Sequence, residues 1–229
     1  MSPLAAALAE NGPDSFIWWD WVDRNRDVIW DRTVDHLRLT VTAVVIGFVV
    51  ALALAALSLR FRRLYGPITW VAGVLYTIPS LALFGLLIPL TGLGFRTALI
   101  ALVSYTLLIL VRNIVEGVDA VPDAVKEAAD GMGFTRGRRF VLVELALATP
   151  AIVAGLRVAS VTVVGLVTVT ALVGEGGLGV LILDGLRRLF PTPIVVGTAL
   201  SVVLALVLDV VFLVIERLLT PWARRSARA

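Results

Sequence analysis

The feature that most constrains this fold is a series of long, uncharged, apolar runs. They cover residues 39–59, 64–95, 97–111, 145–156, 158–174 and 189–208. A helix needs about 20 apolar residues to cross the roughly 30 Å hydrocarbon core of a bilayer. Of the 229 residues, 59% are hydrophobic, which exceeds the usual share in soluble domains. The sequence therefore predicts an all-α membrane protein with about five transmembrane helices, near 37–59, 67–90, 95–113, 145–173 and 193–216.

Basic residues set the predicted orientation, because cytoplasmic loops carry an excess of Lys and Arg. With the N-terminus outside, the inner segments carry Arg60, Arg62, Arg63, Lys126, Arg136, Arg138, Arg139, Arg217, Arg224, Arg225 and Arg228. The outer loops carry only Arg96, Arg187 and Arg188. We therefore expect the N-terminus outside and the C-terminus in the cytoplasm. The expected parts are an extracytoplasmic or interfacial segment at 1–35, a transmembrane domain at 36–218 and a basic cytoplasmic tail at 219–229.

Tryptophans crowd the segment before the first span, at Trp18, Trp19, Trp21 and Trp30. An interfacial helix on the outer leaflet, with its tryptophans at the level of the headgroups, accounts for this composition. An aromatic cage for a quaternary amine is the alternative.

Pro79 and Pro89 interrupt the run at 64–95, which is too long for one upright helix. Proline kinks a membrane helix and frees a carbonyl group, and this is tolerated where the site is packed in protein or lines a cavity. Tyr76, Thr77, Pro79 and Ser80 are therefore candidates for a kinked segment that lines a translocation pathway. An ordinary packing kink is the alternative.

Arg157 and Asp209 lie inside otherwise apolar spans. Charges in a membrane are costly and usually face protein or water, often as pairs. Their predicted depths are similar, so we expect a buried ion pair between the fourth and fifth spans; each charge serving separately is the alternative. In the fourth span Ala151, Gly155 and Ala159 recur every fourth residue, which favours close helix packing, either within one chain or between two copies.

The polar segment 116–140 separates two apolar runs and is too structured to be a bare linker. Pro122 and Asp123 suit the start of a helix, and Gly131 and Gly133 can end it with positive φ. Thr135 can cap a following helix. The segment is therefore predicted to form two short helices around a turn and to dock onto a soluble partner.

A glycine-rich cluster follows the fourth span, at Gly174, Glu175, Gly176, Gly177 and Gly179. It formally satisfies G-x-G-x-x-G, but no strand precedes it, which excludes a dinucleotide-binding fold. We expect a flexible outer turn before a short helix at 180–189 that helps to gate the outer mouth.

Several activities are excluded by residues that the chain lacks. It has no cysteine and a single histidine, His36, so no thiolate nucleophile or metal cluster is expected. No G-x-x-x-x-G-K-[ST] sequence occurs, so the chain cannot hydrolyse ATP by itself. We expect no nucleic-acid partner, because membrane topology accounts for the arginines.

The polar segment also resembles a family motif. Glu127-Ala128-Ala129, three residues, Gly133, nine residues, Val143 and Leu145 is similar to the E-A-A-x3-G-x9-I-x-L-P loop of ABC-importer permeases, with Val143 for isoleucine and Ala146 for proline. The segments 76–83, 111–113 and 171–179, Leu208-Asp209 and Ile215-Glu216-Arg217 resemble the osmoprotectant branch of these permeases. The resemblance covers about residues 36–218.

This resemblance implies the type I ABC-importer permease fold in a prokaryotic plasma membrane, and a non-enzymatic subunit that imports compatible solutes such as glycine betaine, carnitine or choline by alternating access. The implied partners are a second permease subunit, of the same or a related chain, an extracytoplasmic solute-binding protein and a cytoplasmic ATPase dimer that holds the ATP and Mg. Glu127, Ala128, Ala129, Gly133 and Phe134 are the implied contacts with the ATPase. The alternative function is a stand-alone secondary transporter.

Overall fold

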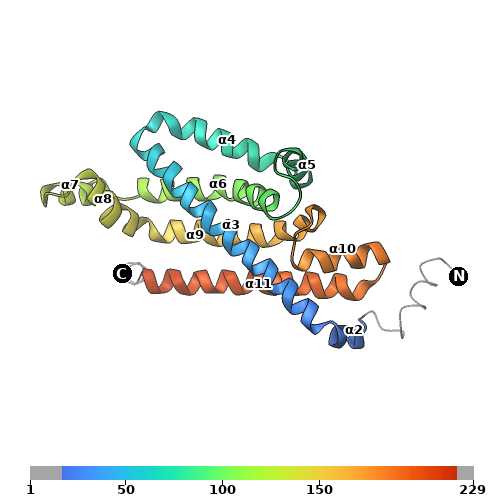
Figure 1. The fold of residues 1–229 in the computed structure, drawn as a ribbon. Helices are drawn as coiled ribbons and strands as arrows, with labels where there is room; N and C mark the ends of the chain where they lie inside the picture. Colours follow the sequence, from blue (N-terminus) through green and yellow to red (C-terminus); the bar gives the residue numbers. More distant parts are fainter. Residues whose placement is uncertain (1–16, 221–229) are drawn as a thin grey trace. The chain divides into compact units, whose positions relative to one another are not determined.

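The computed structural model describes residues 17–220, all of whose regular elements are helical (Figure 1). The beginning of the predicted N-terminal segment, at 1–16, and most of the predicted basic tail, at 221–229 with Arg224, Arg225 and Arg228, lie outside these residues. The helices are α2 (Trp19–Arg24), α3 (Arg26–Arg60), α4 (Tyr65–Thr77), α5 (Ser80–Thr91), α6 (Phe95–Asp119), α7 (Asp123–Gly131), α8 (Arg136–Arg139), α9 (Leu145–Val169), α10 (Leu178–Arg188) and α11 (Pro191–Leu219). Two 3-10 turns, η1 (Arg62–Leu64) and η3 (Thr170–Val173), and one π-helical turn, η2 (Phe140–Glu144), join them.

The expected number of spans agrees with the structure. Four helical segments of the described chain, Arg26–Arg60, Phe95–Asp119, Arg136–Val173 and Pro191–Leu219, are long and apolar enough to cross a membrane. The pair formed by α4 and α5 is a fifth candidate if a bent pair counts as one span.

The second predicted span, 67–90, is not a single helix. Helix α4 ends at Thr77, and the chain is bent by 101° at a two-residue break before α5. At the break Ile78 and Pro79 are both extended, with ψ of 126° and 134°. A proline disfavours helical backbone in the residue before it and has no N–H to donate, so the break follows from Pro79. Pro89 is accommodated inside α5.

The first helix begins earlier than predicted. Helix α3 starts at Arg26 and runs for 35 residues, so the expected boundary between an N-terminal segment and the membrane domain falls inside one continuous helix. The acidic and basic residues before position 39 do not interrupt it, because charged residues are tolerated in a helix that is exposed to water.

The chain divides into two compact units. Unit 1 comprises Met1–Ala43, Pro79–Leu102 and Thr162–Val207, and unit 2 comprises Val44–Ile78, Val103–Val161 and Leu208–Ala229. The four long helices α3, α6, α9 and α11 contribute residues to both units.

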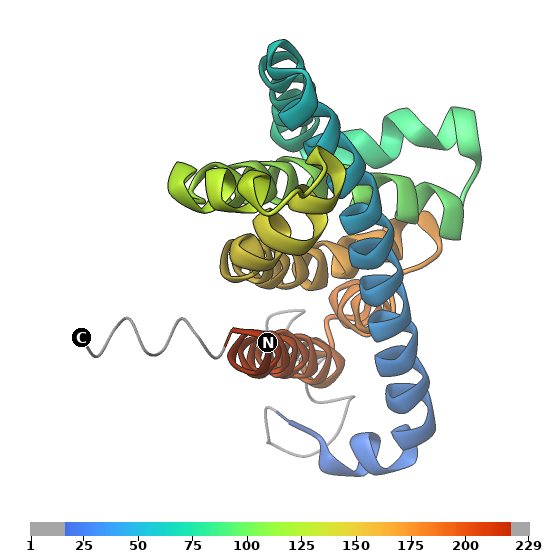
Figure 2. The ribbon, with the colours of Figure 1, turned by 90° about the vertical axis from the view of Figure 1, so that its left-hand side faces the viewer.

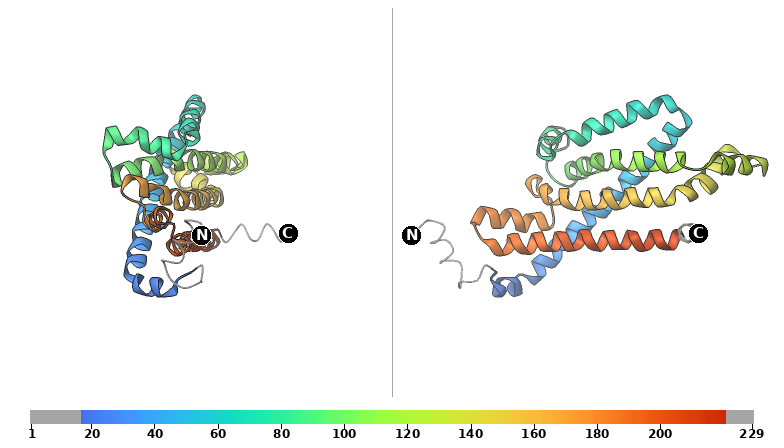
Figure 3. Two further views of the ribbon diagram at one scale, coloured as in Figure 1. Left: turned by 90° about the vertical axis from the view of Figure 1, so that its right-hand side faces the viewer. Right: turned by 180° about the vertical axis from the view of Figure 1, so that it is seen from behind.

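In unit 1, helix α10 runs beside the first part of α11 (Figure 3). The approach is close, because a Cβ at Gly185 would lie 2.6 Å from the Ile194 side chain, and one at Gly197 would lie 2.8 Å from that of Ile182. The turn between the two helices also holds the N-terminal residues. Trp18 donates its backbone N–H to Thr192 Oγ1 at 2.9 Å.

Two of the N-terminal tryptophans pack against a single ring. The rings of Trp18 and Trp21 lie 6.2 and 5.7 Å from that of Phe190. Trp19 and Trp30 remain 68% and 69% exposed. This arrangement favours an anchor with outward-facing tryptophans over an aromatic cage.

In unit 2, small residues bring α6 and α9 together. A Cβ at Gly155 would lie 2.7 Å from Asn113 Cβ, and one at Gly117 would lie 2.8 Å from Ala151 Cβ. Ala159 is fully buried in a cluster with Val111 and Ile114 of α6. The stripe of small residues in the fourth span therefore packs within one chain.

Candidate functional site

Helix α7 of unit 2 presents one face to its own chain and one face outward. Val121, Val125 and Ala129 follow one another at intervals of four residues, and Val121 and Ala129 are only 5% and 1% exposed. Glu127 and Ala128 are exposed. Helices α7 and α8 lie beyond the end of α6 and the start of α9 (Figures 1 and 2). Helix α7 of the polar segment is therefore packed against its own chain on one face and exposes an acidic face on the other.

The expected contact set must be corrected at one position. Ala129 is buried within the chain, so its side chain supports α7 and does not belong to the accessible face. Glu127, Ala128 and Gly133 are exposed, and Phe134 is half-buried. Helical spacing places Ala129 on the same face as Val125, opposite the outward residues.

The turn after α7 is closed by backbone hydrogen bonds. Phe134 N–H donates to the Ala129 carbonyl at 3.1 Å, and Gly133 N–H donates to the Asp130 carbonyl at 2.9 Å. Gly133 has a φ of 79°, as a helix end of this type requires. The prediction of positive φ is confirmed for Gly133 and wrong for Gly131, which is the last residue of α7.

Thr135 starts the next helix, as its sequence position predicts. Its Oγ1 accepts the backbone N–H of Arg138 at 3.4 Å, which confirms the predicted cap. The guanidinium of Arg138 lies 4.7 Å from the centre of the Phe134 ring. The turn from 132 to 138 is therefore held by local contacts at both ends.

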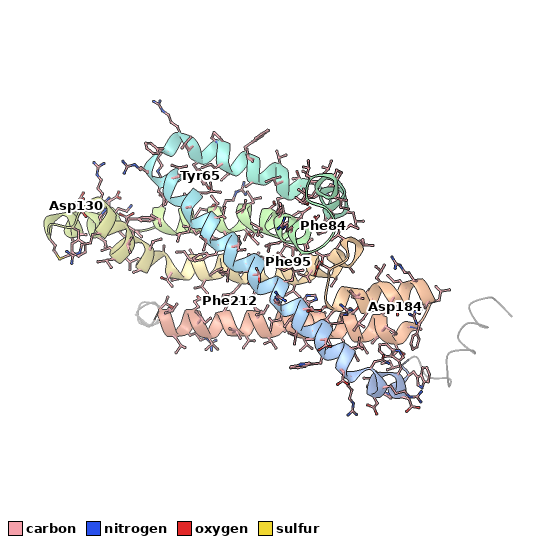
Figure 4. All side chains as sticks on the ribbon, in the orientation of Figure 1. Tyr65, Phe84, Phe95, Asp130, Asp184 and Phe212 are labelled. Carbon is pink, nitrogen blue, oxygen red and sulfur yellow. The ribbon has the colours of Figure 1, made fainter. Side chains whose placement is uncertain are left out.

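Arg139 was expected only as one of many inner basic residues, but it joins three elements. Its Nε donates to Glu144 Oε1 at 2.7 Å, and its Nη1 pairs with Asp130 Oδ2. Asp130 is labelled on α7 in Figure 4, whereas Glu144 is the last residue of the π-helical turn. Sequence reasoning missed this cluster, because the only signal was an arginine five residues before a glutamate, which is not a helical neighbour spacing.

Another ion pair, also not expected, lies elsewhere in unit 2. Both terminal nitrogens of Arg62, in the turn before α4, pair with the carboxylate of Asp119 at the end of α6. A basic residue after one helix and an acidic residue at the end of another carry no signal of pairing in the sequence.

The structure pairs Arg157 of α9 with Asp209 of α11. Arg157 Nε and Nη2 donate to the two carboxylate oxygens at 2.9 and 3.0 Å. Glu216, about two helical turns further along α11, lies 3.9 Å from Nη1 of the same arginine. The expectation that the pair is buried is wrong for this chain alone, since the two side chains are 30% and 36% exposed.

The four pathway candidates lie on either side of the break between α4 and α5. In unit 2, the ring of Tyr76 lies 6.0 Å from that of Tyr105 in an edge-on arrangement, and Tyr105 donates its hydroxyl to the Ile78 carbonyl. Thr77 donates its hydroxyl to the Val74 carbonyl at 2.9 Å. The Ile78 carbonyl at the break is thus partnered, which helps the break to be tolerated in an apolar environment.

In unit 1, Pro79 is exposed and Ser80 lines a cavity of about 310 Å³. The same cavity is lined by Thr168 at the end of α9, by Leu172 of the 3-10 turn η3, and by Gly179 and Ile182 of α10. The structure thus brings together Ser80, a pathway candidate, and Gly179 of the glycine cluster.

Three glycines of the cluster, Gly176, Gly177 and Gly179, pack tightly against neighbouring residues. Gly174, Gly176 and Gly177 have positive φ, and Gly179 lies inside α10, which begins two residues before the predicted short helix. A Cβ at Gly177 would lie 2.5 Å from the Cβ of His36, which is fully buried. His36 Nε2 donates to the Val164 carbonyl at 3.1 Å. The glycines here permit close approach of backbone to neighbouring helices.

Two comparisons of sequence connect this geometry with known proteins. Residues 43–225 match the family described as binding-protein-dependent transport system inner membrane component. The chain is 36% identical over 190 residues to the choline transport system permease protein OpuBB of Bacillus subtilis, covering 83% of this chain and 88% of the relative. It is 37% identical over 202 residues to the osmoprotectant import permease protein OsmW of Salmonella typhimurium, covering 86% and 94%.

The fold is also similar to solved structures. A chain of the inward-facing MetNI methionine ABC transporter superposes with a TM-score of 0.72 at 22% identity, covering 81% of this chain and 93% of that one. A chain of an amino-acid ABC transporter superposes with a TM-score of 0.70 at 17% identity, covering 88% and 98%. These likenesses show the fold of an ABC-importer permease. Fold and sequence together show that this chain belongs to the family of binding-protein-dependent transport system inner membrane components.

Proposed function

We propose that this chain is the membrane-spanning permease subunit of an ATP-driven importer, and that α7 is the element through which a cytoplasmic ATPase moves it. The observation that carries the proposal is helix α7, which is packed against its own chain on one face and exposes Glu127 and Ala128 on a face that no described residue of unit 2 covers. A coupling element must be anchored to the membrane helices and also accessible. ATP hydrolysis, with its ATP and Mg, belongs to the partner.

The proposed solutes are small quaternary-ammonium compounds. Relatives of this chain are named for the transport of choline, of glycine betaine and of carnitine. All three share a permanently charged trimethylammonium group. An extracytoplasmic binding protein delivers the solute to a dimer of permease subunits, formed by two copies or by a related pair. Tyr76, Thr77, Pro79 and Ser80 remain the pathway candidates.

The proposed orientation places the N-terminus outside and α7 in the cytoplasm. It rests on the distribution of Lys and Arg in the loops and is supported by the exposed polar character of α7 and α8.

The test is reconstitution with the cognate ATPase subunits in lipid nanodiscs. We expect a stable complex whose ATPase activity falls with Glu127→Arg, because the substitution reverses a charge on the exposed face of α7. Glu116→Arg is the matched control, since Glu116 is also an exposed glutamate but lies at the end of α6. Wild-type protein that binds no ATPase in nanodiscs and still transports choline into proteoliposomes would identify a stand-alone transporter and overturn the proposal.

A further inference from the structure

One side chain in unit 2 connects α7 to the base of α9. Arg139 places one nitrogen on Asp130 of α7 and another, at 2.7 Å, on Glu144 at the end of the π-helical turn. Its own side chain is 22% exposed and that of Glu144 is 10% exposed. A guanidinium can bind two carboxylates at once because its donors point in several fixed directions. We call these three residues the Arg139 clasp.

The π-helical turn makes the clasp possible. Phe140–Glu144 is wound with one extra residue per turn, so residues five apart come onto the same face. Arg139 and Glu144 are five apart, and in an α-helix they would point in directions about 140° apart. Short π-helical turns are uncommon and occur frequently at functional sites. The turn and the ion pair therefore support each other.

Beyond the clasp, α9 is tied to two further helices of unit 2. Gly155 and Gly117 allow α6 and α9 to touch along their length. Arg157 binds Asp209 of α11 through two hydrogen bonds. A movement of α7 is thus transmitted through the Arg139 clasp to α9 and to the helices packed against it. Without the clasp, α7 would be connected to α9 only through a glycine turn, the four-residue helix α8 and the π-helical turn.

We propose that Arg139 is a positioning residue that transmits the movement of α7 to α9, so that its loss separates ATP hydrolysis from solute movement. The proposal rests on the proposed function. Arg139 does not touch solute or nucleotide in this assignment, and it differs from Glu127 in its place: both of its carboxylate partners belong to its own chain, whereas Glu127 faces outward.

The test uses the complete transporter in proteoliposomes, with the cognate binding protein, radiolabelled choline and ATP. Two quantities are measured for each variant: the amount of ATPase retained by the permease, and the choline moved per ATP hydrolysed. For Arg139→Gln we expect the ATPase to stay bound and the choline moved per ATP to fall roughly tenfold, the size expected when hydrogen bonds to a charged group are lost. Glu144→Gln should act in the same direction.

Further variants separate a positioning role from a general loss of folding. Arg139→Lys keeps a charge that can reach one carboxylate and should give an intermediate ratio. The double variant Arg139→Gln with Glu144→Gln should give a ratio no lower than Arg139→Gln alone. The reason is that each single change already removes the same Arg139–Glu144 ion pair. Arg136→Gln is the matched control, since it removes an exposed arginine from the same short helix and should leave the ratio unchanged.

Two results would overturn the inference while leaving the proposed function intact. The first is a wild-type ratio of choline to ATP in Arg139→Gln, and the second is loss of the bound ATPase in that variant but not in Arg136→Gln, which would make Arg139 a contact residue. A wild-type complex with no solute-dependent ATP hydrolysis would overturn the proposed function itself. If Arg139→Gln does not fold, Arg139→Lys and Glu144→Gln decide by the same ratio.

Discussion

Arg157 and Asp209 are the two charges that the sequence places deepest in the apolar spans. They bind through two hydrogen bonds, and Glu216 lies near the same guanidinium. We expect Arg157→Asp and Asp209→Arg each to lower the midpoint of thermal unfolding in detergent by several degrees, because each places two like charges together. The combined exchange should restore part of the loss. An exchange no more stable than either single variant would show that the pairing contributes nothing.

Single residues also show what sequence reasoning can and cannot supply. The Arg157–Asp209 pair was predictable, because two charges at similar depth in neighbouring apolar helices have few other partners. Its exposure was not predictable, because it depends on how much surface the remaining helices cover. Ala129 was expected among the contacts with the ATPase, but its side chain is buried in its own chain, since a motif shows which residues occur together and not which side of a helix is free.

Among the elements, the end of α7 allows a sharp test with two neighbouring glycines. Gly133 has positive φ, whereas Gly131 is helical and an added Cβ there would meet nothing within 4 Å. Gly133→Ala should destabilise the end of α7 by about 1 kcal/mol, and Gly131→Ala should stabilise the helix by a similar amount. Hydrogen exchange of the α7 amides measures both. We expect faster exchange in the first variant and slower exchange in the second; equal rates would contradict the assigned turn.

Elements defined by local rules were predictable, and those defined by tertiary contacts were not. The two short helices of the polar segment and the cap at Thr135 follow from residues close in sequence. The break at Pro79 was predicted as a kink, whereas the hydrogen bond from Tyr105 of another helix to the Ile78 carbonyl had no signal in the sequence. The π-helical turn that completes the Arg139 clasp has no short-range signature.

For the whole molecule, the natural absence of cysteine makes the proposed orientation directly measurable. Met132→Cys places a single thiol on the turn after α7, at a position that is 69% exposed, and Arg187→Cys places one at the end of α10. In intact cells, a membrane-impermeant maleimide should label Arg187→Cys and leave Met132→Cys unlabelled until the membrane is opened. The reverse pattern would invert the orientation and remove α7 from the cytoplasm.

The 35 residues of α3 form a rod about 52 Å long, at a rise of about 1.5 Å per residue. A bilayer measures only about 40–45 Å with its headgroups included. The apolar stretch from position 39 matches the hydrocarbon core, so the charged beginning of α3 passes through the headgroup layer toward water. The length of the lipid acyl chains therefore determines how far α3 tilts or extends beyond the bilayer, and a change in acyl-chain composition changes how the protein is positioned in its membrane.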